Sequence, residues 1–366
     1  MHDASITDVR AAAYEIPTDA DESDGTLAWN STVLVVVEVD AGGVTGLGYT
    51  YAHQSVVSLV QGKLAGIVKS RSALDVRNAW TAMVREVRNL GAVGVTAMAI
   101  SAVDAALWDL KAKLLDVPLV VALDAVHEVV PIYGSGGFTS YDDEQLTRQL
   151  EGWVSGGIPR VKIKTGRDPD RDRHRLTVAR KAIGDDVELY IDANGALSVR
   201  QAVEWAHIAH GEFGVRWFEE PVTSDDLAGL RVVRDAAPGG IDIAAGEYGW
   251  TPWQLGMMLD AGAVDCLQID ATRCLGVTGF LAAAGLAESH QVDVSAHCAP
   301  ALSAQVCACV RRLRHLEYFH DHVRIESMLF DGVLPVEPGG VLRPDRSVAG
   351  HGLSLCRDVA EKYRVA

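Results

Sequence analysis

Residues 160–166 read RVKIKTG, a short run in which basic and apolar residues alternate. Side chains two apart in a strand point to the same face, so Lys162 and Lys164 share one face. If that face met solvent, the pair would be ordinary. If it lined the inside of a sheet or barrel, two ammonium groups would be forced together where burial disfavours charge. The rest of the chain decides between these cases.

The pattern of an apolar strand with a polar end recurs downstream, and helical stretches separate the strands. The strand-end residues are Lys164, Asp192, Glu219, Glu247, Asp270, His297 and Glu317, spaced 20–28 residues apart. This spacing fits one strand, one helix and two loops. Repeated units of this kind predict parallel strands, and about eight of them close a barrel. A doubly wound open sheet is the alternative, but no glycine-rich phosphate loop follows a first strand.

Three segments are expected along the chain of 366 residues. Residues 1–125 read as an α+β capping domain, with a strand, an exposed acidic loop over residues 17–30, a hairpin and then helices. Residues 126–330 carry the barrel repeats. Residues 331–366 are rich in Gly and Pro and are expected to return to the capping domain.

Composition restricts the class of partner and the compartment. The formal net charge of −16 argues against nucleic acid or an anionic membrane as the main partner. No run approaches the roughly 20 apolar residues that span a bilayer, and residues 1–10 lack the features of a signal peptide. Six cysteines without a CxxC pair read as reduced thiols. We therefore expect a cytoplasmic protein with a small-molecule substrate.

Barrels of this type build their active sites at the C-terminal ends of the strands, so the charged strand ends should converge. Asp192, Glu219 and Glu247 cannot all stay ionised at close range without a compensating cation. An all-oxygen ligand set without Cys or His suits Mg²⁺. Glu219 and Glu220 point to opposite sides of their strand, so we assign the ligand to Glu219 and pairing with a cation such as a lysine to Glu220.

Two general bases are predicted at the same mouth. The lysines are expected opposite the metal-binding acids, where a second cation and Mg²⁺ would lower the pKa of Lys164 toward neutrality. Asp270 ends the strand before His297 and can accept the Nδ1–H that orients the imidazole. Two bases flanking a metal-bound carboxylate suit removal of the α-proton, with Mg²⁺ stabilising an enediolate.

These motifs resemble those of the enolase superfamily, in its mandelate racemase subgroup, over essentially the whole chain. They are KxK at Lys162 and Lys164, DAN from Asp192, EEP from Glu219, GE at Glu247, and the pair Asp270 and His297. The resemblance implies an α/β fold: a TIM-type (β/α)7β barrel with an α+β N-terminal capping domain completed by the C-terminal tail. A muconate-lactonizing member would carry a lysine where this chain has Asp270.

The same resemblance implies roles for individual residues. Lys164 would be one base, with Lys162 assisting it and contacting the substrate carboxylate, and His297 would be the other. Glu317 matches the position that hydrogen-bonds the distal carboxylate oxygen. Asn194 and Arg273 match supporting positions. The chain departs from the common RxGG pattern at Leu275, which should alter loop shape more than chemistry.

The resemblance implies dehydration of an acid sugar to a 2-keto-3-deoxy acid as the first expectation, because this reaction is commoner among members with the KxK motif and the His–Asp pair. A racemase or epimerase of a 2-hydroxy acid is the alternative, because reprotonation from the opposite face needs the same two bases. A non-catalytic binding barrel is a third possibility, but it predicts a missing ligand or base. We expect a homo-oligomer, either a dimer or an octamer.

Two further groups of residues concern the rim of the barrel. Polar aromatic residues of the capping domain are expected to close over the mouth and contact substrate; these are Trp29, Tyr49, Tyr51 and His53. His320 and His322 have the spacing of a strand-end loop, but no carboxylate set near them in the sequence completes a second metal site. We therefore take both histidines as loop or interface residues.

Overall fold

The computed structural model describes residues 4–366 and contains a closed barrel of eight parallel strands, as predicted. Each strand pairs with the next in chain order, and β11 pairs back with β4 to close the ring. The strands are β4 (Val130–Gly136), β5 (Arg160–Lys164), β6 (Glu188–Asp192), β7 (Val215–Glu219), β8 (Asp242–Ala245), β9 (Cys266–Ile269), β10 (Asp293–Ala296) and β11 (Leu313–Phe319). Because every strand is parallel, all their C-terminal ends meet at one mouth.

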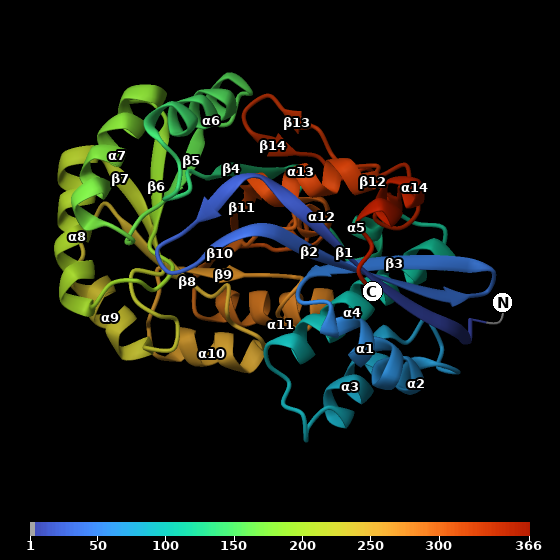
Figure 1. Cartoon of the computed structure of the whole chain (residues 1–366). Coiled ribbons are helices and arrows are strands. Elements are labelled where there is room, and N and C mark those ends of the chain that lie inside the picture. Colours follow the sequence, from blue (N-terminus) through green and yellow to red (C-terminus); the bar gives the residue numbers. More distant parts are fainter. Residues whose placement is uncertain (1–3) are drawn as a thin grey trace.

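Seven helices follow the first seven barrel strands and cover the outside of the barrel (Figure 1). They are α6 (Asp143–Ser155), α7 (Pro169–Ile183), α8 (Val199–Phe213), α9 (Leu227–Ala236), α10 (Pro252–Asp260), α11 (Gly276–Ser289) and α12 (Pro300–Cys307). Five of them begin at a residue whose side chain accepts the backbone N–H three positions later: Asp142, Asp168, Ser198, Asp226 and Thr251. In these five units, the N-cap fixes the residue at which the βα loop ends and the helix begins.

Aromatic side chains fill the barrel just below the charged strand ends. Tyr190, Trp217 and His315 each lie two residues before a strand-end acid, so they point to the same interior face. Tyr133 joins them from β4, with ring centroids 5.5 Å from Tyr190 and 6.4 Å from Trp217. Trp217 Nε1 donates to Glu219 Oε2 at 3.0 Å, so this aromatic floor also positions an acid of the layer above.

The capping domain is a three-stranded antiparallel sheet covered by helices. Its strands are β1 (Ile6–Ser23), β2 (Ala28–Ala41) and β3 (Val44–Tyr51). Its helical elements are α1 (Ser55–Leu59), the π-helix η1 (Val60–Leu64), α2 (Ala65–Val68), α3 (Val76–Glu86), α4 (Val95–Leu114) and α5 (Leu119–Ala122). Helix α4 packs on β3 and also on α11, so it is the main contact between the cap and the barrel.

The acidic stretch 17–30 is not the exposed loop that its composition suggested. Most of it extends β1 and β2 into a long hairpin, with a register shift between Pro17 and Glu22. Figure 1 shows this hairpin (blue) reaching across the barrel. Arg167 holds its tip by donating to the carbonyls of Asp24 (2.8 Å) and Leu27 (2.6 Å). Strand pairing satisfies the backbone, so polar side chains alone were a poor guide here.

After the barrel, the chain forms α13 (His320–Leu329) and then short elements that return to the cap. These are β12 (Phe330–Asp331), β13 (Val336–Glu337), β14 (Val341–Leu342), β15 (Ser354–Leu355), α14 (Arg357–Ala360) and the 3₁₀ helix η2 (Glu361–Tyr363). His351 Nε2 lies 2.7 Å from the carbonyl of Leu47, and Val365 N–H donates to the carbonyl of Ala13 at 2.9 Å. The tail therefore completes the capping domain, while the boundaries at 125 and 330 stay predictions.

No helix within residues 4–366 is both long enough and apolar enough to cross a membrane.

Two glycines of β3 allow the cap sheet to lie directly on α4. A Cβ on Gly48 would lie 2.3 Å from the carbonyl oxygen of Ala102, and one on Gly46 would lie 2.2 Å from that of Ala106. Real Cβ atoms do not approach a backbone oxygen so closely, so a side chain here must separate the two elements.

We therefore expect Gly48→Ala to lower the free energy of unfolding by about 1–3 kcal/mol, the usual cost of overpacking. Urea-induced unfolding measures this. Gly62→Ala is the control, because Gly62 is exposed and a methyl group there would meet no atom within 4 Å. Equal stability of the two variants would contradict the close approach of β3 to α4.

Candidate active site

Three acids from adjacent strands meet at the barrel mouth. Asp192 ends β6, Glu219 ends β7 and Glu247 follows β8, and all three are buried. One carboxylate oxygen of each lies within 4.8 Å of the others. Gly246, at φ +135°, turns the chain after β8, and a Cβ there would lie 2.2 Å from the carbonyl oxygen of Gln268. The predicted ligand set is thus brought together.

Burial makes this arrangement electrostatically costly unless a cation is present. Burial and the charge of Asp192 raise the pKa of Glu219 to about 8, although Lys162 lies beside it. Asn194 Oδ1 is buried without a hydrogen-bond partner among the described residues, and Asn194 lines the adjoining cavity. An unpartnered buried oxygen beside three carboxylates fits a divalent ion, and a set made only of oxygens fits Mg²⁺.

Glu220 does not pair with a lysine as expected. It turns away from the acid cluster at φ +37°, and its Oε1 accepts a hydrogen bond from Ser224. Burial and the charges of Glu247 and Asp192 raise its pKa well above the ordinary value. A neutral Glu220 needs no cationic partner.

The two lysines lie beside the acids and not opposite them, because β5 and β6 are neighbours in the barrel. Lys162 Nζ lies 2.5 Å from Glu219 Oε1 and 2.8 Å from Glu317 Oε1. Lys164 Nζ lies 2.5 Å from Asp192 Oδ2. This answers the question posed by RVKIKTG: the shared face is the barrel interior, and carboxylates compensate both charges.

These neighbours also change the expected pKa of the lysines. Burial alone would lower both values, but the surrounding carboxylates outweigh it and raise them, Asp192 acting on Lys164 and Glu219 on Lys162. A divalent ion on the same carboxylates would offset the charges that raise the pKa of Lys164. Lys162 is fully buried below the cavity, so its contact with a substrate carboxylate stays a prediction.

His297 and Asp270 form the expected dyad. His297 Nδ1 lies 2.7 Å from Asp270 Oδ2, and the hydroxyl of Thr272 donates to the other Asp270 oxygen at 2.7 Å. Nε2 therefore faces the mouth, 3.2 Å from Glu247 Oε2. Burial would lower the pKa of His297, but the groups around it, Glu247 among them, raise it well above the ordinary value.

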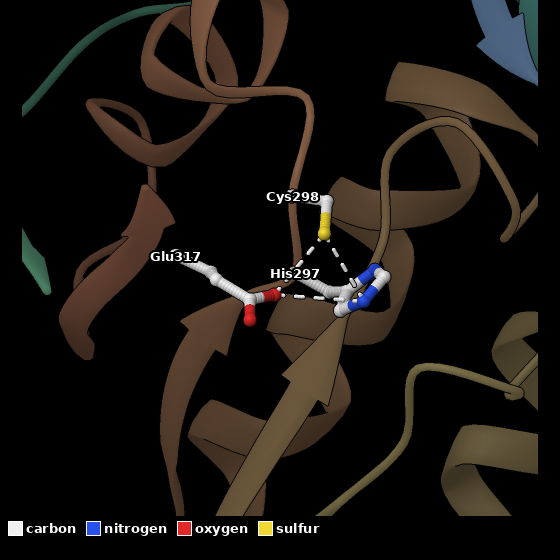
Figure 2. A group of neighbouring side chains, drawn as sticks. All are labelled: His297, Cys298 and Glu317. Carbon is white, nitrogen blue, oxygen red and sulfur yellow. Dashed lines mark hydrogen bonds and ion pairs between the residues drawn. The ribbon is translucent and has the colours of Figure 1, made fainter. Parts of the chain in front are cut away.

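A cysteine that the sequence analysis did not assign to the site lies between His297 and Glu317 (Figure 2). Cys298 Sγ is 3.2 Å from His297 Nε2 and 3.2 Å from Glu317 Oε2. Ser135 holds the other Glu317 oxygen at 2.5 Å. The only signal in the sequence is that Cys298 follows His297 directly, and alternation in a regular strand would have turned it away. The chain instead leaves β10 at φ +48° at Cys298.

Arg273 supports the site from the loop after β9. Its Nε lies 3.4 Å from Asp270 Oδ2, and one terminal nitrogen lies 3.4 Å from Glu247 Oε1. It therefore bridges the dyad and an acid of the cluster. Leu275 takes the left-handed conformation at φ +69° at the start of α11, and its effect on the shape of the loop stays a prediction.

A cavity of about 360 Å³ joins these groups. Its barrel side includes Lys164, Asn194, Glu247, His297 and Glu317. Its cap side includes Leu27, Trp29, Tyr51 and His53. Lys164 on β5 and His297, directly after β10, thus face one space from different sides of the barrel, with the acid cluster between them.

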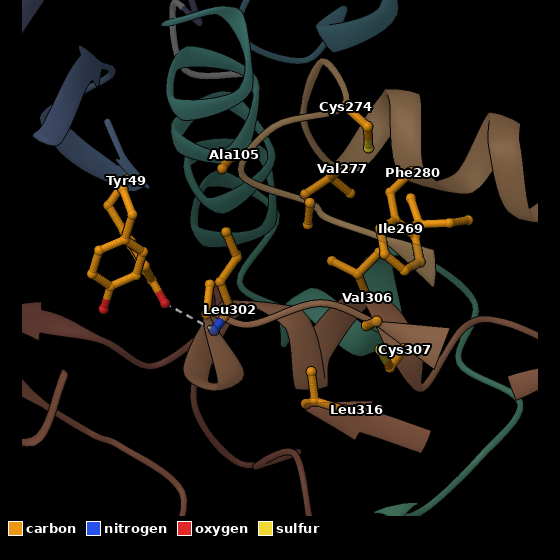
Figure 3. Packing of buried hydrophobic residues seen from close by; sticks show 14 of the residues in the cluster. Tyr49, Ala105, Ile269, Cys274, Val277, Phe280, Leu302, Val306, Cys307 and Leu316 are labelled. Carbon is orange, nitrogen blue, oxygen red and sulfur yellow. Dashed lines mark hydrogen bonds between the residues drawn. The ribbon is translucent and has the colours of Figure 1, made fainter. Parts of the chain in front are cut away.

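Not all of the cap residues that were expected to contact substrate line the cavity. Trp29 and His53 line the cavity, but Tyr49 does not, and we no longer propose it as a substrate contact. Its ring is fully buried, and its hydroxyl donates to Glu326 (2.7 Å) and accepts from the N–H of Leu302 (3.1 Å). Figure 3 shows Tyr49 within the core beside Leu302. Tyr49 therefore fastens β3 to the barrel.

Tyr51 and His322 occupy the position beside the mouth. Their rings stack with centroids 3.4 Å apart, and both line the cavity. His322 Nδ1 accepts the N–H of Ala299 at 3.2 Å, and burial lowers the pKa of His322 well below its ordinary value. His322 is therefore a buried, neutral part of the site and not the loop or interface residue that we expected.

A capped (β/α)7β barrel with buried acids and two opposed bases at one mouth defines the class of metal-dependent enzymes that act on carbon acids. Sequence models agree with this class. Residues 19–123 match the mandelate racemase/muconate lactonizing enzyme N-terminal domain, and residues 145–359 match the enolase C-terminal domain-like family. The chain belongs to the mandelate racemase/muconate lactonizing enzyme family of the enolase superfamily.

Known relatives cover nearly the whole chain. A 3,6-anhydro-alpha-L-galactonate cycloisomerase from Streptomyces coelicolor is 32% identical, over 96% of this chain and 97% of its own. A mandelate racemase/muconate lactonizing enzyme-like protein from Rubrobacter xylanophilus is 52% identical, with a TM-score of 0.96 over 99% and 100% of the two chains. An L-talarate dehydratase from Polaromonas, complexed with Mg and L-glucarate, is 27% identical, with a TM-score of 0.89 over 99% and 98%.

Proposed function

We propose that this protein removes the α-proton of an acid-sugar carboxylate with Mg²⁺ and then expels a β-oxygen to give a 2-keto-3-deoxy acid. The observation that carries the proposal is the placement of Lys164 and the His297–Asp270 dyad on one cavity beside Asp192, Glu219 and Glu247. Magnesium in the Polaromonas dehydratase supports the choice of metal.

Asp192, Glu219 and Glu247 would hold the ion, which supplies a positive charge to the carboxylate as electron density moves into it. Lys164 Nζ and His297 Nε2 approach the cavity from different sides, so one can take the α-proton while the other donates a proton to the leaving oxygen. Asp270 keeps His297 Nδ1 protonated and Nε2 directed at the substrate. Glu317, which lines the cavity with Lys164 and His297, would hydrogen-bond the substrate.

The leaving oxygen separates two reactions that share this chemistry. Loss of a free β-hydroxyl takes up a proton from the enzyme and releases water, which makes the enzyme a dehydratase. When the leaving group is a ring oxygen, it takes up the same proton but stays attached to the product through the rest of the ring. The enzyme is then a cycloisomerase. We place dehydration first, as expected from the sequence. The cycloisomerase is the second candidate because a relative with that activity is 32% identical over nearly the full chain.

Racemisation remains the alternative outcome for the same pair of bases. It needs no leaving group, and it requires only that the second base return a proton to the opposite face of the α-carbon. A homo-oligomer, a dimer or an octamer, and a cytoplasmic location remain part of the proposal.

A panel of sugar acids tests the proposal directly. Mono- and diacid sugars, together with their lactones and 3,6-anhydro forms, are incubated with enzyme and Mg²⁺ in D₂O and followed by NMR. We expect a 2-keto-3-deoxy product with one solvent deuteron at C3. An open-chain substrate identifies a dehydratase, and a cyclic substrate that gives an isomeric product identifies a cycloisomerase. Deuterium at C2 with no keto product indicates a racemase and contradicts β-elimination.

A further inference from the structure

A second group of metal-binding side chains lies where the β1–β2 hairpin meets the barrel. Asp19 and Glu22 belong to β1, and His320 begins α13. One donor atom of each lies within 4.8 Å of the others, and His320 Nε2 is 3.0 Å from Asp19 Oδ2. The carboxylates that the sequence around His320 lacked therefore come from residues about 300 positions earlier in the chain.

Glu22 has a vacant acceptor in this group. Its side chain is buried, with 1% of the residue exposed, and Trp29 Nε1 donates to its Oε2 at 2.7 Å. Its Oε1 is buried without a hydrogen-bond partner among the described residues. A buried carboxylate oxygen without a donor is costly, and a cation is one of the few groups that satisfies it.

The charges around Glu22 favour an added cation. Burial and the carboxylates of Asp321 and Asp19 raise the pKa of Glu22 to about 8. Arg324 is the nearby positive group, but it is already engaged, since it donates to Asp321 (2.6 Å) and to the carbonyl of Pro17 (2.7 Å). The local balance is therefore negative once Glu22 ionises.

We propose that Asp19, Glu22 and His320 form a second cation site, selective for a divalent transition metal such as Zn²⁺. One imidazole nitrogen with two carboxylate oxygens is a donor set that suits Zn²⁺, whereas the all-oxygen cluster in the barrel suits Mg²⁺. Asp19 and His320 are partly exposed, so an ion can enter from solvent without opening the barrel.

An ion at this site would connect the cap to the catalytic cavity. It would join β1 to the start of α13 directly, and it would fix Glu22, which positions Trp29 on the cavity wall. Occupancy is therefore expected to hold the hairpin over the mouth and to affect substrate binding more than the chemical step.

Titration calorimetry with Zn²⁺ in excess Mg²⁺ tests the site, because Mg²⁺ keeps the barrel cluster filled. We expect Zn²⁺ to bind, and His320→Gln and Asp19→Asn each to weaken that binding by at least about tenfold. His174→Gln is the matched control. His174 forms an exposed ion pair with Asp143 at 2.8 Å, but no third ligand joins them among the groups found in residues 4–366.

The Cys298→Ser variant tests whether Zn²⁺ binds instead to a second group that contains a soft ligand. That group consists of His297, Cys298 and Glu317. Retained Zn²⁺ binding in Cys298→Ser, with loss in His320→Gln, supports the hairpin site. Loss in Cys298→Ser with retention in His320→Gln overturns it, as does the absence of Zn²⁺ binding to the parent protein. Hydrogen exchange of the peptide spanning residues 19–29 should slow with Zn²⁺ in the parent, in His174→Gln and in Cys298→Ser, and should not slow in His320→Gln.

Discussion

Replacing His297 with asparagine is expected to lower turnover by about 10²–10⁴-fold, the usual contribution of a general acid–base group. Lys164→Ala should cost a similar factor. The reason is geometric, because the two groups face the same cavity from different sides of the barrel. Steady-state kinetics on the substrate found in the sugar-acid panel measures both losses.

Partial reactions should separate the roles of these two bases. If Lys164→Ala still exchanges the α-proton with D₂O while His297→Asn does not, His297 abstracts the proton. The opposite pattern assigns abstraction to Lys164. Near-normal turnover in both variants would show that the opposed-base mechanism is wrong.

Asp270→Asn provides a graded control for this prediction. Its side chain keeps the shape of Asp270, but the negative charge that accepts the Nδ1–H of His297 is lost. We expect a smaller loss of turnover than in His297→Asn, together with a shift in the pH profile. His174→Gln, an exposed histidine on α7, should leave turnover unchanged.

Replacing Glu219 with glutamine is expected to weaken Mg²⁺ binding by about 100-fold or more, which corresponds to about 2.7 kcal/mol. The variant removes one of three carboxylates from the buried cluster and keeps the side-chain volume. Turnover at low Mg²⁺ should fall by at least the same factor. Calorimetry with Mg²⁺ and the dependence of turnover on Mg²⁺ concentration measure the two effects.

Glu220→Gln is the matched control for this loss. Glu220 is the next residue in the EEP motif, it is equally buried, and it accepts a hydrogen bond from Ser224 outside the cluster. We expect Mg²⁺ affinity to change little in this variant, because the Glu220 side chain turns out of the acid cluster toward Ser224. Weaker Mg²⁺ binding in Glu220→Gln than in Glu219→Gln would reverse the assignment of the ligand.

The barrel and its acids could be predicted because the sequence pattern that specifies them is local and is repeated in each βα unit. A strand alternates its side chains with a period of two, and a barrel places every strand end at one mouth. Asp192 and Glu219 could thus be placed from their own strands. The carboxylates that contact Lys162 could not be predicted, since a charge at a strand end does not determine which carboxylate lies beside the lysine.

The residues of the cap were predicted less well for a physical reason. Tyr49 and Tyr51 lie on the same face of β3, with ring centroids 6.0 Å apart, so alternation cannot distinguish them. Only their distance along the strand puts one in the core and the other beside the cavity. Asp19 and His320 meet through tertiary contacts across about 300 residues, which no local pattern encodes.

The return of the chain to its first domain has a consequence for biosynthesis. The backbone of Ala13 in β1 pairs with residues 365 and 366, and the N–H of Leu119 donates to the carbonyl of Gly350 at 2.7 Å. During translation, the cap sheet must wait for partners that the ribosome makes only after the whole barrel. The barrel is therefore free to fold first, and the cap would reach its final stability only once residues 350–366 have been made.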